Sequence, residues 1–216
     1  MRREFHVRFC EGGGVRFPSA TRLIVGFQHE REARQFLAAL RDRLAEYGLE
    51  LHPDKTRLIE FGARAASDRD REGRGKPETF DFLGFTHVCG KTRDGRFAVV
   101  RQTAPKRMRT KLHEVKAELW KRLHDPVPEV GRWLASVIRG HIQYYAVPRN
   151  FPAVQAFCER AIRRWKRALN RRSQTSKVTW PRMRRLARRW IPRVRIVHPY
   201  PSQRPFLRTY GRSPVW

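Results

Sequence analysis

The sequence predicts an α+β protein, with a strand-containing first half followed by a helical second half. Up to about residue 103, short apolar runs bounded by turn residues recur, which is typical of strands. From Pro105 onward, apolar residues recur every three or four positions, the spacing of amphipathic helices. These observations predict an irregular start over 1–21, a strand-containing part over 22–103, a helical part over 104–190 and a proline-rich extended tail over 191–216.

The beginning of the chain contains signals for one strand and one helix. The run Gly12-Gly13-Gly14 and the lack of any sustained periodicity favour the irregular start. Leu23–Phe27 suits a buried strand, and a helix is expected to begin at Glu30 and to end at Gly48. The apolar face of that helix comprises Ala33, Phe36, Leu37, Leu40, Leu44 and Tyr47.

The rest of the first half has the pattern of a small sheet. Thr56–Phe61 is predicted as a strand, and the charged, glycine-containing stretch 62–78 as a loop. Phe80–Phe85 begins another strand, and Asp94-Gly95 between two short apolar runs is a strong hairpin signal.

Four helices are expected in the second half. They cover approximately Pro105–Leu123, Glu129–Tyr145, Val154–Leu169 and Trp180–Trp190. His141 falls in the apolar register of the second helix, and no other histidine or carboxylate lies four residues away. We therefore expect a packed, hydrogen-bonded core histidine and not a ligand or a base.

Charge is concentrated in the second half of the chain. The whole chain has a formal charge of +28, but residues 1–100 hold 19 basic and 15 acidic side chains, whereas residues 101–216 hold 29 and 5. So uneven a distribution predicts that the second half binds a polyanion.

Arginines form one face of the third and fourth expected helices. A solvated helix face normally mixes charges of both signs, yet Glu159 is the only acidic residue from position 130 to the end. Arginine suits bidentate phosphate contacts and stacking on unpaired bases. Tyr144 is the best aromatic candidate for base contact, because Trp133 and Tyr145 share the core register. The candidate nucleic-acid-binding residues, which the family resemblance given below assigns to RNA, are Arg160, Arg163, Arg164, Arg167, Arg171, Arg182, Arg185, Arg189 and Tyr144.

Several classes of protein do not fit the sequence. Cys10, Cys89 and Cys158 lie far apart, which argues against a disulfide scaffold or a structural zinc site. No apolar run approaches the ~18 residues that would span a bilayer. The apolar faces of the basic helices are needed for the core, so a membrane is a poorer partner than nucleic acid. We expect a cytoplasmic protein without a membrane partner.

Three segments, in order, resemble the bacterial group II intron reverse transcriptase/maturases over about residues 23–216. They read LIVGFQHEREARQFLAALRDRLAEYGLELHPDKTRLIEFG, GKPETFDFLGFTHVCGKTRDGRF and EVGRWLASVIRGHIQYYAVPRNF. The resemblance implies that 22–103 is a remnant of the polymerase palm and that 104–190 forms the thumb and the maturase-specific domain X. The implied partner is structured group II intron RNA, in splicing or intron mobility, with DNA as a further polyanion.

The same resemblance implies roles for two sites in the first half. Lys55 matches a palm lysine thought to protonate the leaving pyrophosphate. The primer-grip hairpin of the family corresponds to Phe82, Leu83, Gly84 and Phe85.

The chain departs from the family where polymerase chemistry needs carboxylates. Reverse transcriptases hold two metal ions, Mg²⁺ in the full-length family, through palm carboxylates that include a Tyr-Ala-Asp-Asp directly before the apolar strand. Here that place reads Pro18-Ser19-Ala20-Thr21-Arg22 and contains no carboxylate. We therefore expect no metal site and no cofactor in this chain, and no polymerase activity from the chain alone.

Three interpretations stay open from the sequence. The chain is an RNA-binding module, or the C-terminal component of a split RNA-directed DNA polymerase completed by a separate upstream chain, or a decayed relic. A frameshift or deletion before Leu23 would explain the unrelated first residues. Cysteine pairs or a His-Asn-His cluster, which some relatives carry as a DNA endonuclease, are absent from the tail.

Overall fold

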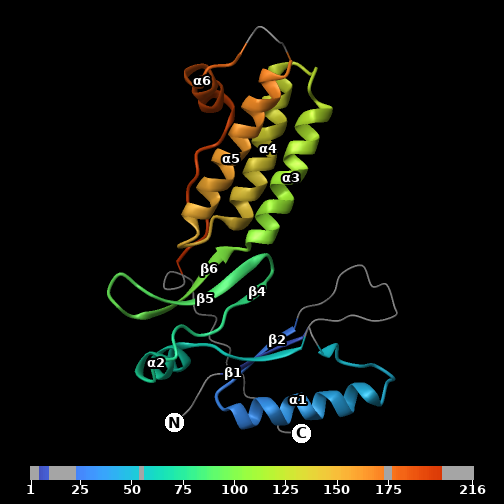
Figure 1. The fold of residues 1–216 in the computed structure, drawn as a ribbon, viewed down its shortest axis with the longest axis vertical. Coiled ribbons are helices and arrows are strands. Elements are labelled where there is room, and N and C mark those ends of the chain that lie inside the picture. The colour runs from blue at the N-terminus through green and yellow to red at the C-terminus, as the bar shows by residue number, and fades with distance from the viewer. Residues whose placement is uncertain (1–4, 10–22, 54–55, 173–176, 201–216) are drawn as a thin grey trace. The chain divides into compact units, whose positions relative to one another are not determined.

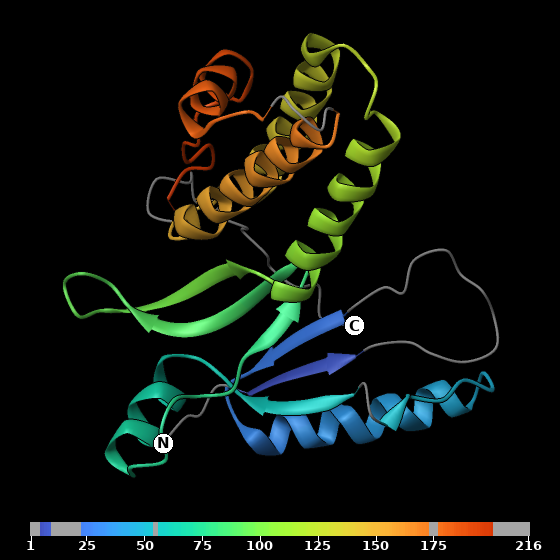
Figure 2. The same ribbon diagram turned by 45° about the horizontal axis from the view of Figure 1, so that its top comes forward.

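The computed structural model describes residues 5–9, 23–53, 56–172 and 177–200. The chain divides into two compact units, Met1–Ala104 and Pro105–Trp216. The described strands belong to the first unit, and the described elements of the second are helices (Figures 1 and 2). The α+β class predicted from the sequence is therefore confirmed.

The first unit contains a three-stranded antiparallel sheet whose central strand comes from the start of the chain. Strand β1 (Phe5–Phe9) lies between β2 (Leu23–Phe27) and β3 (Arg57–Glu60), and Val7 pairs with both Val25 and Leu58. The prediction of an irregular start is therefore wrong for Phe5–Phe9. These five residues alternate apolar and polar side chains, and backbone pairing on both edges stabilises such a strand. The rest of 1–21 lies outside the described residues.

Helix α1 (Glu30–Ala45) covers this sheet with its apolar face. Ala33 is fully buried, and Phe27, Phe36 and Leu40 are among the partly buried side chains packed around it. Tyr47, which the sequence pattern assigned to the same face, is 64% exposed. The helix ends at Ala45, and the chain then turns at Gly48 with a φ of +67°, so Tyr47 falls outside the helical register.

A second helix occupies part of the stretch that was predicted as a loop. Helix α2 (Ala63–Arg71) follows Gly62 and buries Ala65. Its alanines favour a helix, and the Arg69 Nη1 lies 3.2 Å from the Glu60 carboxylate at the end of β3. The loop prediction over 62–78 is therefore wrong for this segment, because the charged residues that indicated a loop lie on a short helix, where Arg64, Asp70 and Arg71 are exposed and Asp68 and Arg69 are half-buried.

The remaining strands of the first unit form two successive hairpins. They are β4 (Phe80–Phe82), β5 (Phe85–Lys91) and β6 (Phe97–Thr103). Phe82 pairs with Phe85, and the two residues between them, Leu83 and Gly84, have φ angles of +47° and +79°. Positive φ at both central residues is characteristic of the type I′ hairpin turn. The second turn contains Gly95 with a φ of +77°, which confirms the predicted hairpin.

The second unit packs four helices around one core. They are α3 (Pro105–Lys121), α4 (Val127–Tyr145), α5 (Phe151–Asn170) and α6 (Trp180–Trp190), so all four predicted helices are confirmed within a few residues. Trp165 and Phe157 of α5, Leu134 and Ile138 of α4 and Met183 of α6 are fully buried there.

Residues 191–200 contain no helix or strand and run along this core. The Val197 N–H donates to the Ala146 carbonyl at 3.1 Å, and the ring of His198 is hydrogen-bonded to the Gln143 carbonyl at 2.7 Å. Val194 and Val197 pack against the core. These contacts attach the segment to the end of α4.

The crossing of α4 and α6 depends on a glycine. A Cβ added to buried Gly131 would lie 2.7 Å from Cγ of Trp190 and 2.9 Å from Cδ1 and Cδ2. Gly131→Ala is therefore expected to destabilise the protein by about 1–3 kcal/mol, since the rigid indole has to move.

Gly140, on the same helix, provides the matched control for this prediction, because a Cβ there meets no atom within 4 Å. Gly140→Ala is expected to stabilise the helix by about 0.5–1 kcal/mol. Chemical denaturation measures both changes. Equal effects of the two substitutions would contradict the close contact at Gly131.

Candidate nucleic-acid interface

The arginines predicted on the third helix form a stripe on the surface of α5. Trp165 of α5 is buried in the core together with Met108 and Val115 of α3, whereas the arginines lie on the other face of α5. Four are exposed and Arg164 is half-buried. We call this set the arginine stripe; it comprises Arg160, Arg163, Arg164, Arg167 and Arg171.

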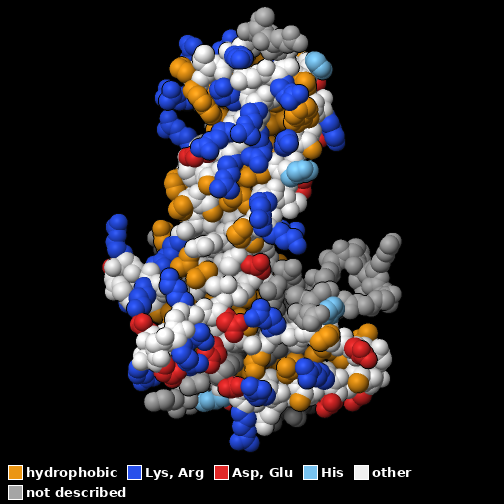
Figure 3. All heavy atoms as spheres, in the orientation of Figure 1, with side chains coloured by type: hydrophobic (Ala, Val, Ile, Leu, Met, Phe, Trp, Pro, Cys, Tyr) orange, Lys and Arg blue, Asp and Glu red, His pale blue; other side chains and the backbone are white. Residues whose placement is uncertain are grey.

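Helix α6 extends the positive surface. Met183 is fully buried, and Arg182, Arg185 and Arg189 are exposed, as are the neighbouring Arg184 and Arg188. In Figure 3 the Lys and Arg side chains are spread over the visible face of the helical unit, where Asp and Glu side chains are few. The predicted positions on both helices are thus accessible to a ligand.

Most of these charges have no acidic partner. Arg163 lies 4.0 Å from Glu159, and within the described residues no other arginine of the stripe is within 4.0 Å of a carboxylate. In the first unit, by contrast, exposed arginines are commonly paired; Arg43 with Glu46 at 2.8 Å and Arg57 with Glu78 at 2.6 Å are examples. The uncompensated charge is a property of the second unit, and an anionic ligand would relieve its self-repulsion.

Arg164 is the most constrained arginine of the stripe. Its Nη1 donates to the Arg160 carbonyl at 3.2 Å, whereas its buried Nε has no hydrogen-bond partner in the described structure. Burial, together with the charges of Arg167 and Arg160, lowers the pKa of Arg164. A phosphate bound beside the guanidinium group would supply the negative charge that this cluster of arginines lacks.

Arg164, Arg167 and Arg171 also line a groove between α3 and α5, which we call the α3–α5 groove. Lys116 and Trp120 line it from α3. Trp120 is 44% exposed, and the guanidinium carbon of Arg171 lies 4.5 Å from the centroid of its ring. The sequence analysis missed Lys116 and Trp120. The sequence feature that could have indicated them is their spacing of four residues on α3, at positions outside its buried apolar face.

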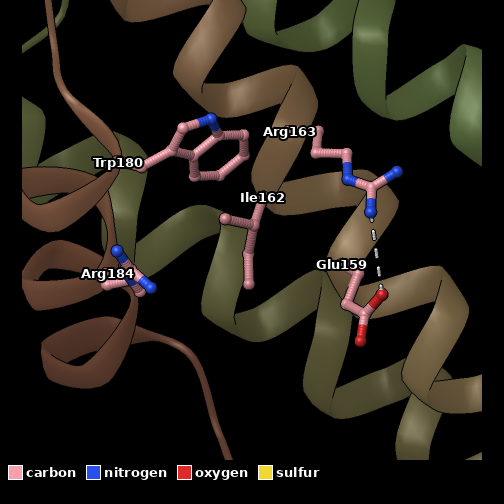
Figure 4. Close-up of a pocket in the computed structure, with 5 residues that line it drawn as sticks. All are labelled: Glu159, Ile162, Arg163, Trp180 and Arg184. Atoms are coloured by element: carbon pink, nitrogen blue, oxygen red, sulfur yellow. Dashed lines mark ion pairs between the residues drawn. The ribbon is translucent and has the colours of Figure 1, made fainter.

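A second groove lies between α5 and α6 (Figure 4). Trp180 of α6 points towards Ile162, and Arg184 lies on the same helix. Trp180 is 47% exposed, and the Nζ of Lys166 lies 5.2 Å from the centroid of its ring. Glu159 also lines this groove, so its charge is mixed.

His141 and Tyr144 lie beside a pocket between α3 and α4. His141 is 6% exposed and stacks on Phe157 with a 3.6 Å separation of ring centroids. The predicted packing of His141 is confirmed, but its Nε2 has no hydrogen-bond partner in the described structure. Burial, followed by the nearby charge of Lys111, lowers the pKa of His141 to about 4. Tyr144 is 50% exposed, so it is accessible for the predicted base contact.

The candidate sites of the first unit have little in common with this surface. Lys55 lies outside the described residues. Phe82, Leu83, Gly84 and Phe85 form the β4–β5 turn, where Leu83 is 61% exposed and Phe85 is buried. Across the described ranges, no three His, Cys, Asp or Glu side chains are grouped so that they could hold a metal ion.

No described helix combines the length and apolarity needed to cross a membrane. The chain matches no protein-family model, and no curated protein matches it significantly. Proposals about function therefore rest on the sequence resemblance and on the surface of the helical unit.

Proposed function

We propose that this chain binds structured RNA and is the RNA-binding part of a group II intron reverse transcriptase/maturase. The observation that carries the proposal is the positive surface of α5 and α6. These two helices contain nine exposed or half-buried arginines and one acidic residue, Glu159. The arginines are Arg160, Arg163, Arg164, Arg167, Arg182, Arg184, Arg185, Arg188 and Arg189. A surface of this kind binds phosphates.

In this proposal the two units take different parts of the family architecture. The first unit corresponds to the palm remnant, with the β4–β5 turn at Phe82–Phe85 as the primer-grip hairpin. The second corresponds to the thumb and domain X, and intron RNA in the cytoplasm is the partner. The tight turn at Leu83 and Gly84 supports the correspondence with a hairpin.

The packing of the basic helices favours nucleic acid over a membrane. An amphipathic helix that lies on a bilayer inserts its apolar face into the lipid. Trp165 of α5 and Met183 of α6 are fully buried in the protein core, so these faces are already occupied. The arginine-bearing faces of both helices are exposed and available to a partner.

Competition at physiological salt tests the preference for RNA. Labelled folded intron RNA is displaced by the same RNA unlabelled or by a DNA duplex of equal length. We expect the RNA to compete more strongly per phosphate, since loops, A-form grooves and 2′-hydroxyls offer contacts that a DNA duplex lacks. Equal competition would contradict the maturase function and leave a non-specific polyanion binder.

The chain alone is expected to lack templated DNA synthesis. The position directly before Leu23 offers no carboxylate for two-metal chemistry, because Ser19, Ala20, Thr21 and Arg22 stand there. Primer extension on an RNA template with Mg²⁺ is the measurement. Incorporation of nucleotides above a control without protein would show that the carboxylates are supplied elsewhere in the chain.

A further inference from the structure

The α3–α5 groove differs from the rest of the positive surface because it combines cations with an open aromatic ring. Lys116, Arg164, Arg167 and Arg171 line it, and no carboxylate is among the described residues that do. Trp120 stays 44% exposed although Arg171 stacks against it at 4.5 Å. Cations alone are sufficient to hold phosphates, so the exposed indole is unexplained by phosphate binding.

We propose that the α3–α5 groove holds one unpaired nucleotide of the bound RNA, with Trp120 against the base and the arginines against its phosphate. The inference rests on the proposed function and specifies which part of the RNA this groove holds. Every base has a π-face, so stacking on a tryptophan is tolerant of sequence. Inside a duplex both faces of each base are covered by neighbouring pairs, so an unpaired nucleotide in a loop, a bulge or a single-stranded end has to supply such a base.

The polar groups of the groove fit a phosphate beside that base. Arg164 and Arg167 lie three residues apart on α5, and Lys116 lies one turn from Trp120 on α3, so both helices contribute cations next to the ring. Arg164 is half-buried at the groove, and within the described residues no carboxylate lies within 4.0 Å of its guanidinium group. A phosphate oxygen is an acceptor that carries the charge this environment lacks.

The α5–α6 groove provides a comparison within the same unit. Trp180 is 47% exposed and also has a cation near its ring, Lys166 at 5.2 Å. That groove, however, contains the carboxylate of Glu159, which would repel a phosphate (Figure 4). Trp180 is therefore a matched control for Trp120, similar in exposure and in its cation contact but different in the charge beside it.

Two RNA probes and three variants of the full chain test the inference. The probes are an RNA hairpin with an unpaired adenosine loop and a blunt RNA duplex with the same number of phosphates. Trp120→Leu is expected to lower affinity for the hairpin about 5- to 100-fold and to leave the duplex within about twofold. Trp120→Phe keeps a stacking ring and should restore most of the hairpin affinity, and Trp180→Leu should leave both affinities within about twofold.

Tryptophan fluorescence gives a second readout that does not depend on affinity. Stacking of a base on Trp120 should quench part of the emission when the hairpin saturates the wild-type chain, and this part should be missing in Trp120→Phe. Circular dichroism confirms that each variant remains helical.

The outcomes separate this inference from the proposed function. An equal loss of hairpin and duplex affinity in Trp120→Leu, or no loss of either, would overturn the nucleotide pocket while RNA binding stands. Failure of the wild-type chain to bind either RNA would instead overturn the proposed function and the pocket with it.

Discussion

Replacing Arg163, Arg164 and Arg167 with alanine is expected to weaken binding to structured RNA about 100-fold at ~0.15 M salt. Each phosphate neutralised by a side chain contributes about 0.7–0.9 to the slope of log K against log salt. Losing three contacts should therefore flatten that slope by about 2–3, and between 1 M and 0.15 M salt such a change amounts to about two powers of ten in affinity. Fluorescence anisotropy at a series of salt concentrations measures the slope directly.

A control variant with the same net charge separates contact from total charge. Arg34, Arg43 and Arg96 are exposed arginines of the first unit, and each is paired with a carboxylate of its own. Their replacement by alanine also removes three positive charges but should change the slope by less than about 1. If both triple variants flatten the slope equally, RNA responds to net charge and the stripe on α5 is not the binding face.

The helices of the second unit could be predicted from sequence because their signal is local. Each buries one stripe against a common core, and the 3.6-residue period of side chains such as Leu134, Ile138 and Phe157 records that stripe. Strand β1 and helix α2 were missed for different reasons. Strand β1 is stabilised by pairing with strands that begin at Leu23 and Arg57, which are 14 and 48 residues after its last residue, Phe9. Helix α2 has a weak sequence signal, because its helix propensity is weak and it buries one alanine, Ala65.

Of the candidate site, the arginines of α5 could be predicted from sequence, but the grooves between helices could not. Spacing along one helix is enough to place Arg163 and Arg167 on the face opposite Trp165, and the structure has them there. Spacing along α3 does not show that Trp120 lies beside Arg171, because this contact joins two helices about 50 residues apart in the chain. Grooves between helices become visible only once the packing is known.

The surroundings of His141 set up a pH dependence of stability. Its ring lies between helices, stacked on Phe157 of α5, and Lys111 of α3 adds a repulsive charge. Arg107 and Glu114 of α3 and Tyr144 of α4 line the same pocket. Burial raises the pKa of Tyr145 and raises the pKa of Cys158 to about 12, so both remain neutral in acid. His141 is then the group in this part of the core that gains a charge as the pH falls.

Acid should therefore destabilise the second unit through His141. Unfolding restores the pKa of His141 from about 4 to its ordinary value of 6.5, so below pH 6.5 the unfolded chain binds a proton that the folded chain excludes. Stability is full above pH 6.5, falls between 6.5 and 4, and by pH ~4.5 has decreased by about 2–3 kcal/mol from this group. Chemical denaturation at pH 7.5 and 4.5 measures the loss.

The variant His141→Phe keeps a ring against Phe157 but cannot take up a proton. The decrease in its stability between pH 7.5 and 4.5 should therefore be smaller than that of the wild type by this same amount. Replacement of the exposed His113 with glutamine controls for the number of histidines. An unchanged pH dependence in His141→Phe would show that the core accepts the protonated ring.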